Sequence, residues 1–341
     1  MKIIKSLLFL LFFIVMTSFS QTKILFDTDF GSDADDLGAL AMLHGFQQTG
    51  EADLLGVMIW STEKFVVPAV DAVNRYYGHP DVPVGIRPGD PHHSEWNYNK
   101  PIADQLPWEL KNDDVPDVTT LYRKILSAEE DSSVTLITVG PLMNIKLLLE
   151  SGPDEYSELP GKELFHNKIK EMVVMGGQYP EGEQEWNFWG EMKGVTQFVF
   201  DKIEVPVVFS GYEIGEAIRS GAVFNEISKD SPLYIGFKHF SEHAPWMKDN
   251  YRGKILDNAT FDQTAVLYAV RGGVGRYWEK IRGGYNKIDE DGNNRWVEGD
   301  ETNQSYLRLI EDPEKMTLLI EKLMLKPEPE SYGENLQIRE L

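Results

Sequence analysis

The chain has 341 residues and a formal net charge of −22, from 55 acidic against 33 basic side chains. This excess of acid argues against nucleic acids and anionic membrane surfaces as partners, because both are bound by Lys and Arg side chains that neutralise phosphates. The chain has no cysteine, which excludes disulfides and thiolate metal sites.

The N-terminus carries a targeting pattern. Lys2 and Lys5 precede an apolar run over residues 7–16, and Ser18-Phe19-Ser20, with its two small serines, follows it. This order is typical of a secretory signal peptide. A membrane anchor is the competing interpretation, but the run is shorter than the roughly 20 residues that a spanning helix needs. The sequence therefore predicts a signal peptide over residues 1–20, export to the periplasm or the extracellular space, and no stable membrane anchor.

The most informative stretch is residues 27–36, Asp-Thr-Asp-Phe-Gly-Ser-Asp-Ala-Asp-Asp, which places five carboxylates in ten positions. An apolar run over residues 24–26 precedes it and a helix-like run over 37–43 follows. This order of strand, turn and helix places the carboxylates at the carboxyl end of a strand, where open α/β sheets bind their ligands. Crowded carboxylates repel one another, and hard oxygen ligands suit Ca²⁺ or Mg²⁺. The competing interpretation is a solvated acidic loop.

Strand-like and helix-like segments alternate along the rest of the chain. Continuous apolar runs indicate strands buried on both faces, and helical spacing of apolar residues indicates helices. In chain order we expect a strand over 54–60, a helix over 68–77, a strand over 82–86, a helix over 118–126, a strand over 134–139, a helix over 142–149, strands over 172–175 and 205–209, a helix over 261–270, and a last helix that Asp312 caps and that runs to Met324. This alternation predicts an α/β fold, in which residues 21–341 form one domain with an open, mainly parallel sheet flanked by helices.

Two segments depart from this alternation. Residues 87–117 are rich in Pro, His, Trp and Asn and show little periodicity, so we expect a lid or a binding loop there. Residues 289–294, Asp-Glu-Asp-Gly-Asn-Asn, look at first like a calcium loop. The glycine, however, stands at the fourth place and not at the sixth, where an EF-hand needs it. We therefore expect a hairpin turn over residues 289–294.

Residues 27–36 resemble the signature of the nucleoside hydrolase family, of the inosine-uridine-preferring type. In that signature an Asp-x-Asp-x-Gly-x-Asp-Asp motif ends the first strand, and here it carries two extra residues. The resemblance implies that the chain binds one Ca²⁺ ion and hydrolyses the N-glycosidic bond of ribonucleosides, which are uncharged small molecules. Because the insertion shifts the carboxylates, it stays open whether Asp27 and Asp33 face the ion.

The same resemblance assigns roles to the acidic residues. It implies that Asp29, Asp36, Asp262 and the backbone carbonyl of Val139 hold the Ca²⁺ ion. Asp29 would also take the proton of the attacking water as general base. Asp35 would bind a ribose hydroxyl. Taken alone, Asp262 could equally be an ordinary acidic residue in the first turn of a helix.

A second group of matching residues follows the strand that ends at residue 175. There, Glu185-Trp186-Asn187 resembles the family's Glu-Phe-Asn triplet. In an extended segment Glu185 and Asn187 point to the same side, so both can bind the remaining ribose hydroxyls. Trp186 and Trp189 are candidates for stacking on a flat base.

The sequence departs from the family at the leaving-group side of the site. The family often has a histidine immediately before the last metal ligand, where it serves the departing base, and this chain has Phe261. His92 and His93, in the segment without periodicity, are the histidines that remain as candidates to relay a proton.

Two other function classes stay open from the residues alone. A haloacid-dehalogenase-like phosphohydrolase would use Asp27 as nucleophile and Asp29 beside Mg²⁺, but it leaves Glu185, Asn187 and Asp262 without roles. An exported nucleoside or sugar binder without catalysis is the other class. Phosphate release from p-nitrophenyl phosphate, compared with base release from inosine, separates the two enzymes. The sequence also leaves open whether the chain forms a homo-oligomer.

Overall fold

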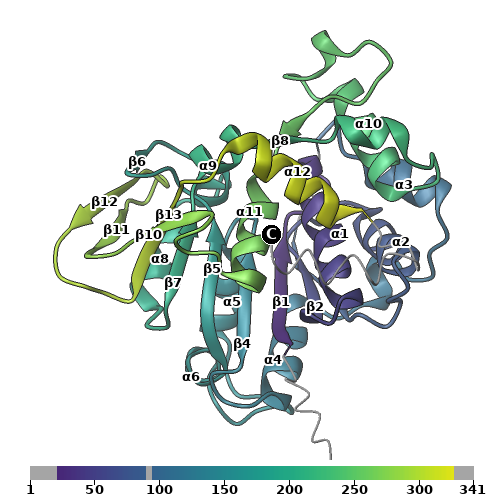
Figure 1. Ribbon diagram of the computed structural model, residues 1–341. Coiled ribbons are helices and arrows are strands. Elements are labelled where there is room, and N and C mark those ends of the chain that lie inside the picture. Colours follow the sequence, from purple (N-terminus) through teal and green to yellow (C-terminus); the bar gives the residue numbers. More distant parts are fainter. Residues whose placement is uncertain (1–20, 90–93, 326–341) are drawn as a thin grey trace, which may run out of the picture.

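The computed structural model describes residues 21–89 and 94–325, and Figure 1 shows their arrangement. A central sheet runs through the molecule with the strand order β10-β13-β7-β5-β4-β1-β2-β3. All neighbours in it are parallel except β10 and β13. Its strands are β1 (Thr22–Thr28), β2 (Ala52–Ile59), β3 (Val84–Ile86), β4 (Val134–Thr138), β5 (Ile169–Met175), β7 (Val207–Ser210), β10 (Trp278–Ile281) and β13 (Gln304–Leu309).

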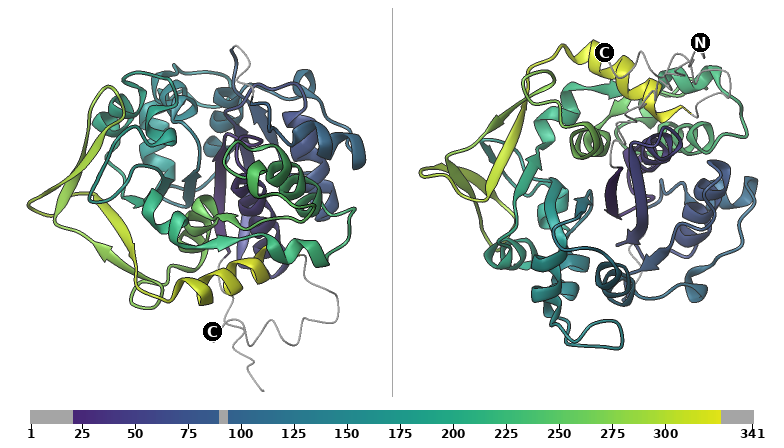
Figure 2. Two further views of the ribbon diagram at one scale, coloured as in Figure 1. Left: turned by 90° about the horizontal axis from the view of Figure 1, so that it is seen from above. Right: turned by 60° about the horizontal axis from the view of Figure 1, so that its bottom comes forward.

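Helices cover both faces of this sheet, as Figures 1 and 2 show. The α-helices are α1 (Ala34–Gln48), α2 (Val66–Tyr76), α3 (Asn99–Gln105), α4 (Val118–Ala128), α5 (Met143–Glu150), α6 (Gly161–Lys168), α7 (Trp186–Trp189), α8 (Val195–Lys202), α9 (Tyr212–Ala217), α10 (Pro232–His243), α11 (Phe261–Arg271) and α12 (Pro313–Met324). The prediction of an open, mainly parallel sheet flanked by helices is therefore confirmed.

The alternation of side chains along β1 divides the core in two. Ile24 and Phe26 pack into the cluster formed with α1, α2, α10, α11 and α12. Leu25 points the other way, into the cluster formed with α4, α5, α6 and α8. Successive residues of a strand face opposite sides of a sheet, so a continuous apolar run is what a strand with helices on both faces requires.

The two helices that begin at the acidic end of the sheet pack very closely. A Cβ added at Gly38 of α1 would lie 2.3 Å from Nε2 of Gln263 in α11. Glycine is therefore what allows the two helices to approach, and this approach brings their first turns together. Those first turns carry Asp35 and Asp36 on α1 and Asp262 on α11.

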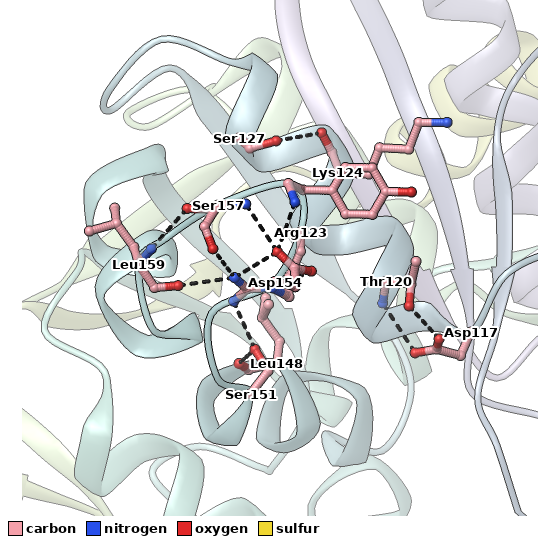
Figure 3. A network of polar contacts seen from close by, with 11 residues as sticks. Asp117, Thr120, Arg123, Lys124, Ser127, Leu148, Ser151, Asp154, Ser157 and Leu159 are labelled. Carbon is pink, nitrogen blue, oxygen red and sulfur yellow. Dashed lines mark hydrogen bonds and ion pairs between the residues drawn. The ribbon is translucent and has the colours of Figure 1, made fainter.

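On the other face of the sheet, one buried arginine ties α4 to the connection between α5 and α6 (Figure 3). Arg123 forms an ion pair with Asp154 (2.7 Å) and donates hydrogen bonds to Ser151 and to the backbone carbonyls of Ser157 and Leu159. Because the guanidinium is almost fully buried, these partners are what make its burial tolerable. The network fixes the scaffold on the side away from the first turns of α1 and α11.

Several sequence predictions need correction. The segment over residues 87–117, expected to be irregular, contains α3 and the 3₁₀ helix Asn112–Asp114. Helices α6, α8 and α10 were not predicted from the sequence. The prediction of a hairpin at residues 289–294 is confirmed, because this turn joins the antiparallel strands β11 (Gly284–Ile288) and β12 (Asn294–Glu298).

The smaller elements complete the described structure. Strand β12 also pairs with β6 (Glu181–Gly182), and β8 (Arg219–Ser220) pairs with β9 (Asn258–Ala259). The other 3₁₀ helices are Ala222–Glu226 and Lys248–Asn250. Within residues 21–89 and 94–325, no helix is long and apolar enough to cross a bilayer. The predicted signal peptide lies outside the described residues, and so do His92 and His93.

Candidate functional site

A cavity of about 710 Å³ opens where the parallel strands β1, β4 and β5 end. Strands of a parallel sheet present their carboxyl ends at one edge, so the residues that follow them gather there. The cavity lining includes ten of the residues singled out from the sequence: Asp29, Asp33, Asp35, Asp36, Val139, Glu185, Trp186, Asn187, Phe261 and Asp262. Asp27 and Trp189 are not among the lining residues.

Three buried carboxylates form the centre of the site. Asp35 and Asp36 come from the first turn of α1 and Asp262 from the first turn of α11, and each offers an oxygen within 4.8 Å of the other two. The backbone N–H of Asp262 donates to Asp35 Oδ2 (3.3 Å), and the hydroxyl of Thr28 donates to Asp36 Oδ1. Burial, and then repulsion from neighbouring carboxylates, raises the pKa of each of the three groups well above its ordinary value.

This arrangement fits a hard divalent cation. The three groups are oxygen donors at close range and are almost completely buried. Among the described residues that line the cavity, none is Lys, Arg or His, so no side chain there neutralises the carboxylates. A bound cation would supply the missing positive charge, and carboxylate oxygens are the ligands that Ca²⁺ and Mg²⁺ prefer.

Asp29 lies in the same cavity at the end of β1. Its Oδ2 accepts a hydrogen bond from the indole Nε1 of Trp186 (2.8 Å), which leaves Oδ1 without that donor. Burial raises its pKa to about 6, although the hydrogen bond from Trp186 opposes the increase. The backbone after β4 comes close behind it, because a Cβ added at Gly140 would lie 2.8 Å from the backbone nitrogen of Asp29. The carboxylate is therefore held in a confined position.

The prediction that Glu185 and Asn187 lie on an extended segment is wrong. Glu185 is the N-cap of α7, and its Oε1 accepts from the backbone N–H of Asn187 (3.1 Å). Its Oε2 accepts from the backbone N–H of Gly177 (2.8 Å). Capping oxygens satisfy donors that a helix start leaves free, so the triplet turns into a helix instead of continuing as a strand. Both side chains still line the cavity.

Asn187 connects the site to the ends of two strands. Its Nδ2 donates to the carbonyls of Val139 (3.1 Å) and Met175 (3.2 Å). The Val139 carbonyl, expected from the sequence to be a metal ligand, therefore already accepts one hydrogen bond and keeps one lone pair for another partner. The amide oxygen Oδ1 of Asn187 can accept a hydrogen bond from a hydroxyl group of the substrate.

Asp27 and Asp33, which the sequence left open, have structural partners. The carboxylate of Asp27 accepts hydrogen bonds from the Tyr122 hydroxyl (2.6 Å) and from Asn144 Nδ2 (3.1 Å). Asp33 lines the cavity, is the N-cap of α1 and accepts from Asn258 Nδ2 (2.5 Å). Tyr122 and Asn258 were not found from the sequence, because a hydrogen bond between distant segments leaves no local pattern.

Aromatic side chains form much of the remaining wall. Phe261 stacks on Tyr212 with ring centroids 5.0 Å apart, and both line the cavity. Trp189, predicted as a stacking surface for a base, packs edge-on against Trp186 with centroids 6.0 Å apart. The indole N–H of Trp186 is committed to Asp29, which fixes that ring beside the carboxylates.

Comparison with known proteins identifies the family. The chain matches the family model of the inosine-uridine preferring nucleoside hydrolases over residues 24–307. It therefore belongs to that family and is an N-ribosyl hydrolase. No curated protein sequence matches the chain. The membership disfavours the phosphohydrolase alternative, and so does the position of Asp27, whose carboxylate would be the nucleophile but lies outside the cavity lining.

Solved structures share the fold at low sequence identity. The chain is similar to the inosine-uridine preferring nucleoside hydrolase of Bacillus anthracis, with 13% identity and a TM-score of 0.65, over 90% of this chain and 100% of that one. It is similar to a plant nucleoside hydrolase, with 16% identity and a TM-score of 0.62, over 90% and 99% of the two chains. An inosine-guanosine nucleoside hydrolase gives 16% identity and a TM-score of 0.59, over 89% and 98%.

Proposed function

We propose that the protein is an exported, Ca²⁺-dependent hydrolase that cleaves ribonucleosides to ribose and free base. The observation that carries the Ca²⁺ dependence is the group of three buried carboxylates, Asp35, Asp36 and Asp262, without a cationic neighbour in the described lining. Export rests on residues 1–20 alone. The neutral nucleoside substrate is consistent with the acidic character of the whole chain.

The carboxylates divide into two roles in this proposal. Asp36, Asp262, Asp29 and the free lone pair of the Val139 carbonyl would hold the ion, and Asp35, which lies beside Asp36 and Asp262, would share it or bind a ribose hydroxyl. When bound, Ca²⁺ orients the ribose diol and a water molecule and lowers the pKa of that water. All of these groups line the same cavity, so they would act on the same substrate.

Asp29 is the general base. Because Trp186 holds its Oδ2, its Oδ1 is the atom that takes the proton of the attacking water. The N-glycosidic bond breaks through an oxocarbenium-like state, in which positive charge develops on the ribose. Buried carboxylates near the sugar stabilise that charge. Glu185 and Asn187, fixed by the α7 cap and by the ends of β4 and β5, orient the remaining hydroxyls.

The test is a panel of purine and pyrimidine ribonucleosides assayed for free ribose, with the metal removed by chelation and then with Ca²⁺ or Mg²⁺ restored. We expect cleavage that chelation abolishes and Ca²⁺ restores, and no phosphate release from p-nitrophenyl phosphate. Full activity in excess EDTA would contradict the metal dependence. Nucleoside binding by calorimetry without any release of ribose would instead make the protein a binder. N-terminal sequencing of the secreted protein tests cleavage after Ser20.

A further inference from the structure

The outer rim of the cavity carries a second set of carboxylates, distinct from those that would hold a cation. Glu95, Glu183 and Glu191 line the cavity and are exposed to solvent. None of the ion pairs found within residues 21–89 and 94–325 involves any of the three. No ion pair among the described residues therefore offsets their negative charge.

Flat aromatic surfaces line the same cavity as these rim carboxylates. Trp96 and Trp246 line the cavity and pack edge to face, with centroids 5.4 Å apart, and Trp96 Nε1 donates to the carbonyl of Ser32 (2.7 Å). Tyr212 and Phe261, which also line the cavity, form a stacked pair of rings. Aromatic faces attract cations as well as flat rings, so this rim suits a ring that is both flat and positively charged.

The described lining also lacks a group placed to protonate a departing base. It contains no Lys, Arg or His. Both oxygens of Glu185 accept backbone N–H bonds, and the hydroxyl of Tyr212 donates to Glu216 (3.5 Å), outside the cavity lining. A neutral base takes the electron pair of the breaking bond and departs as an anion unless an acid protonates it, which typically contributes about 10²–10⁴ in rate.

We propose that the preferred substrates are ribonucleosides whose base carries a positive charge, such as N-ribosyl pyridinium compounds. This inference rests on the proposed function and narrows it. When the N-glycosidic bond breaks, its electron pair neutralises the ring nitrogen, so the base leaves as a neutral molecule without an acid. Water adds to the ribose carbon and its proton passes to Asp29 and then to solvent. The balance is one cationic nucleoside and one water giving ribose, a neutral base and one proton.

The same charges disfavour anionic relatives of these substrates. A 5′-phosphate would bring negative charge into a cavity with nine carboxylates and no described cationic side chain, namely Asp29, Asp33, Asp35, Asp36, Glu95, Glu183, Glu185, Glu191 and Asp262. The net charge of −22 repels anions and attracts cations at longer range, to the extent that salt does not screen it. The charge of a substrate therefore decides whether it enters the cavity, before the shape of its base matters.

The first experiment compares nicotinamide riboside, inosine and inosine 5′-phosphate with the Ca²⁺-loaded enzyme. We expect kcat/KM for nicotinamide riboside to exceed that for inosine by a factor of about 10² or more. We expect no detectable cleavage of the N-glycosidic bond of inosine 5′-phosphate. If inosine is cleaved as well as or better than the cation, this inference is overturned and the proposed function stands. If neither nucleoside is cleaved, the proposed function fails.

A second experiment separates recognition of charge from the higher intrinsic reactivity of a cationic substrate. The variant Glu95→Gln/Glu183→Gln/Glu191→Gln should lower the preference for nicotinamide riboside over inosine about tenfold, mainly through a higher KM for the cation. The matched control removes the same charge from exposed glutamates outside the cavity lining, as Glu155→Gln/Glu158→Gln/Glu301→Gln, and should keep the preference. An equal preference in both variants would overturn the role of the rim.

Discussion

Two acid-rich loops, over residues 27–36 and 289–294, differ in their burial and in the partners of their carboxylates. In the first, Asp29, Asp35 and Asp36 are almost completely buried and burial raises their pKa values. In the second, Asp289 is exposed, and hydrogen bonds from Asn293 above all lower its pKa. The second loop lies in the β11–β12 hairpin at the margin of the molecule (Figures 1 and 2).

The difference lies in the donors that each loop finds. Asp289 Oδ1 accepts from the backbone N–H groups of Asp291 and Asn293 (3.0 Å each), and its Oδ2 accepts from Asn293 Nδ2 (2.9 Å). The Asp289 carboxylate therefore finds its hydrogen-bond donors within its own turn and does not need a bound ion. The first loop turns its carboxylates toward one another and toward Asp262. Acidic composition alone therefore does not indicate a metal site, whereas burial without neutralisation does.

The largest effect on activity is expected when a negative charge is removed from the first loop or from Asp262 beside it. Asp36→Asn and Asp262→Asn should each lower kcat/KM on inosine by about 10³ or more, because each removes a ligand of the proposed Ca²⁺ ion. Steady-state kinetics and elemental analysis of the purified variants measure both effects. Asp291→Asn, the same change in the second loop, should leave activity and metal content intact. Equal effects at both loops would mean that the first loop is not a metal site.

Removal of the metal should also lower the free energy of unfolding, and variants at the two loops should differ in this loss. A ligand that binds only the folded state stabilises it by about 2.7 kcal/mol at a concentration of 100 Kd. Denaturant unfolding in Ca²⁺ and in chelator should show a difference of this order for the natural chain and for Asp291→Asn. The difference should vanish in Asp262→Asn. If chelation left the stability of the natural chain unchanged, Ca²⁺ would have no site in the folded protein.

Asn187, which lines the same cavity as the first loop, tests the contact with ribose. Asn187→Ala should cost about 2 kcal/mol in kcat/KM if its contact with ribose tightens in the transition state. Because the contact is with ribose, the loss should be similar for inosine and uridine. Thermal unfolding monitors the separate loss of its bonds to Val139 and Met175. Very different losses for the two nucleosides would place Asn187 in the base pocket.

The smallest effect is expected at the second loop. Asp289→Ala should lower the free energy of unfolding by about 1 kcal/mol, the usual contribution of the hydrogen bonds it removes. Since the folded pKa of Asp289 is lowered, its stabilisation is present at neutral pH and is lost as pH falls through that lowered pKa. Asp300→Ala, at an exposed position after β12, serves as the control. Loss of Ca²⁺ binding in Asp289→Ala would contradict the distinction between the loops.

Local patterns made much of the fold predictable. The continuous apolar run before Asp27 and the helix after it indicated a buried strand and its crossover, and Asp312 indicated the start of α12, because these signals act within a few residues. Helix α6 has only Leu164 and Phe165 as buried apolar side chains, too few to show a helical period. Helix α10 was missed although Leu233, Phe237 and Phe240 lie buried at helical spacing. The turn at Glu185 was missed because its side chain could equally cap a helix or line an extended segment.

The sequence predicted which carboxylates belong to the site, but not the hydrogen bonds that hold them in place. The carboxylates of the first loop were visible as a dense cluster in the sequence. The bond between Trp186 and Asp29, and those from Tyr122 and Asn144 to Asp27, join segments more than ninety positions apart. Contacts of that separation follow from the assembled sheet and leave no periodicity to read. The rim glutamates Glu95, Glu183 and Glu191 escaped notice for the same reason.

The pairing of α1 with α11 has a consequence for the order in which the protein assembles. Asp35 and Asp262 stand 227 positions apart in the chain of 341 residues, so the hydrogen bond between them closes a loop of about two thirds of its length. During synthesis, the ribosome must complete α11 before any cation finds its full set of ligands. A cation bound there would therefore join the protein late in folding. Because its full site forms late, binding would slow unfolding of the folded protein and leave the folding rate almost unchanged.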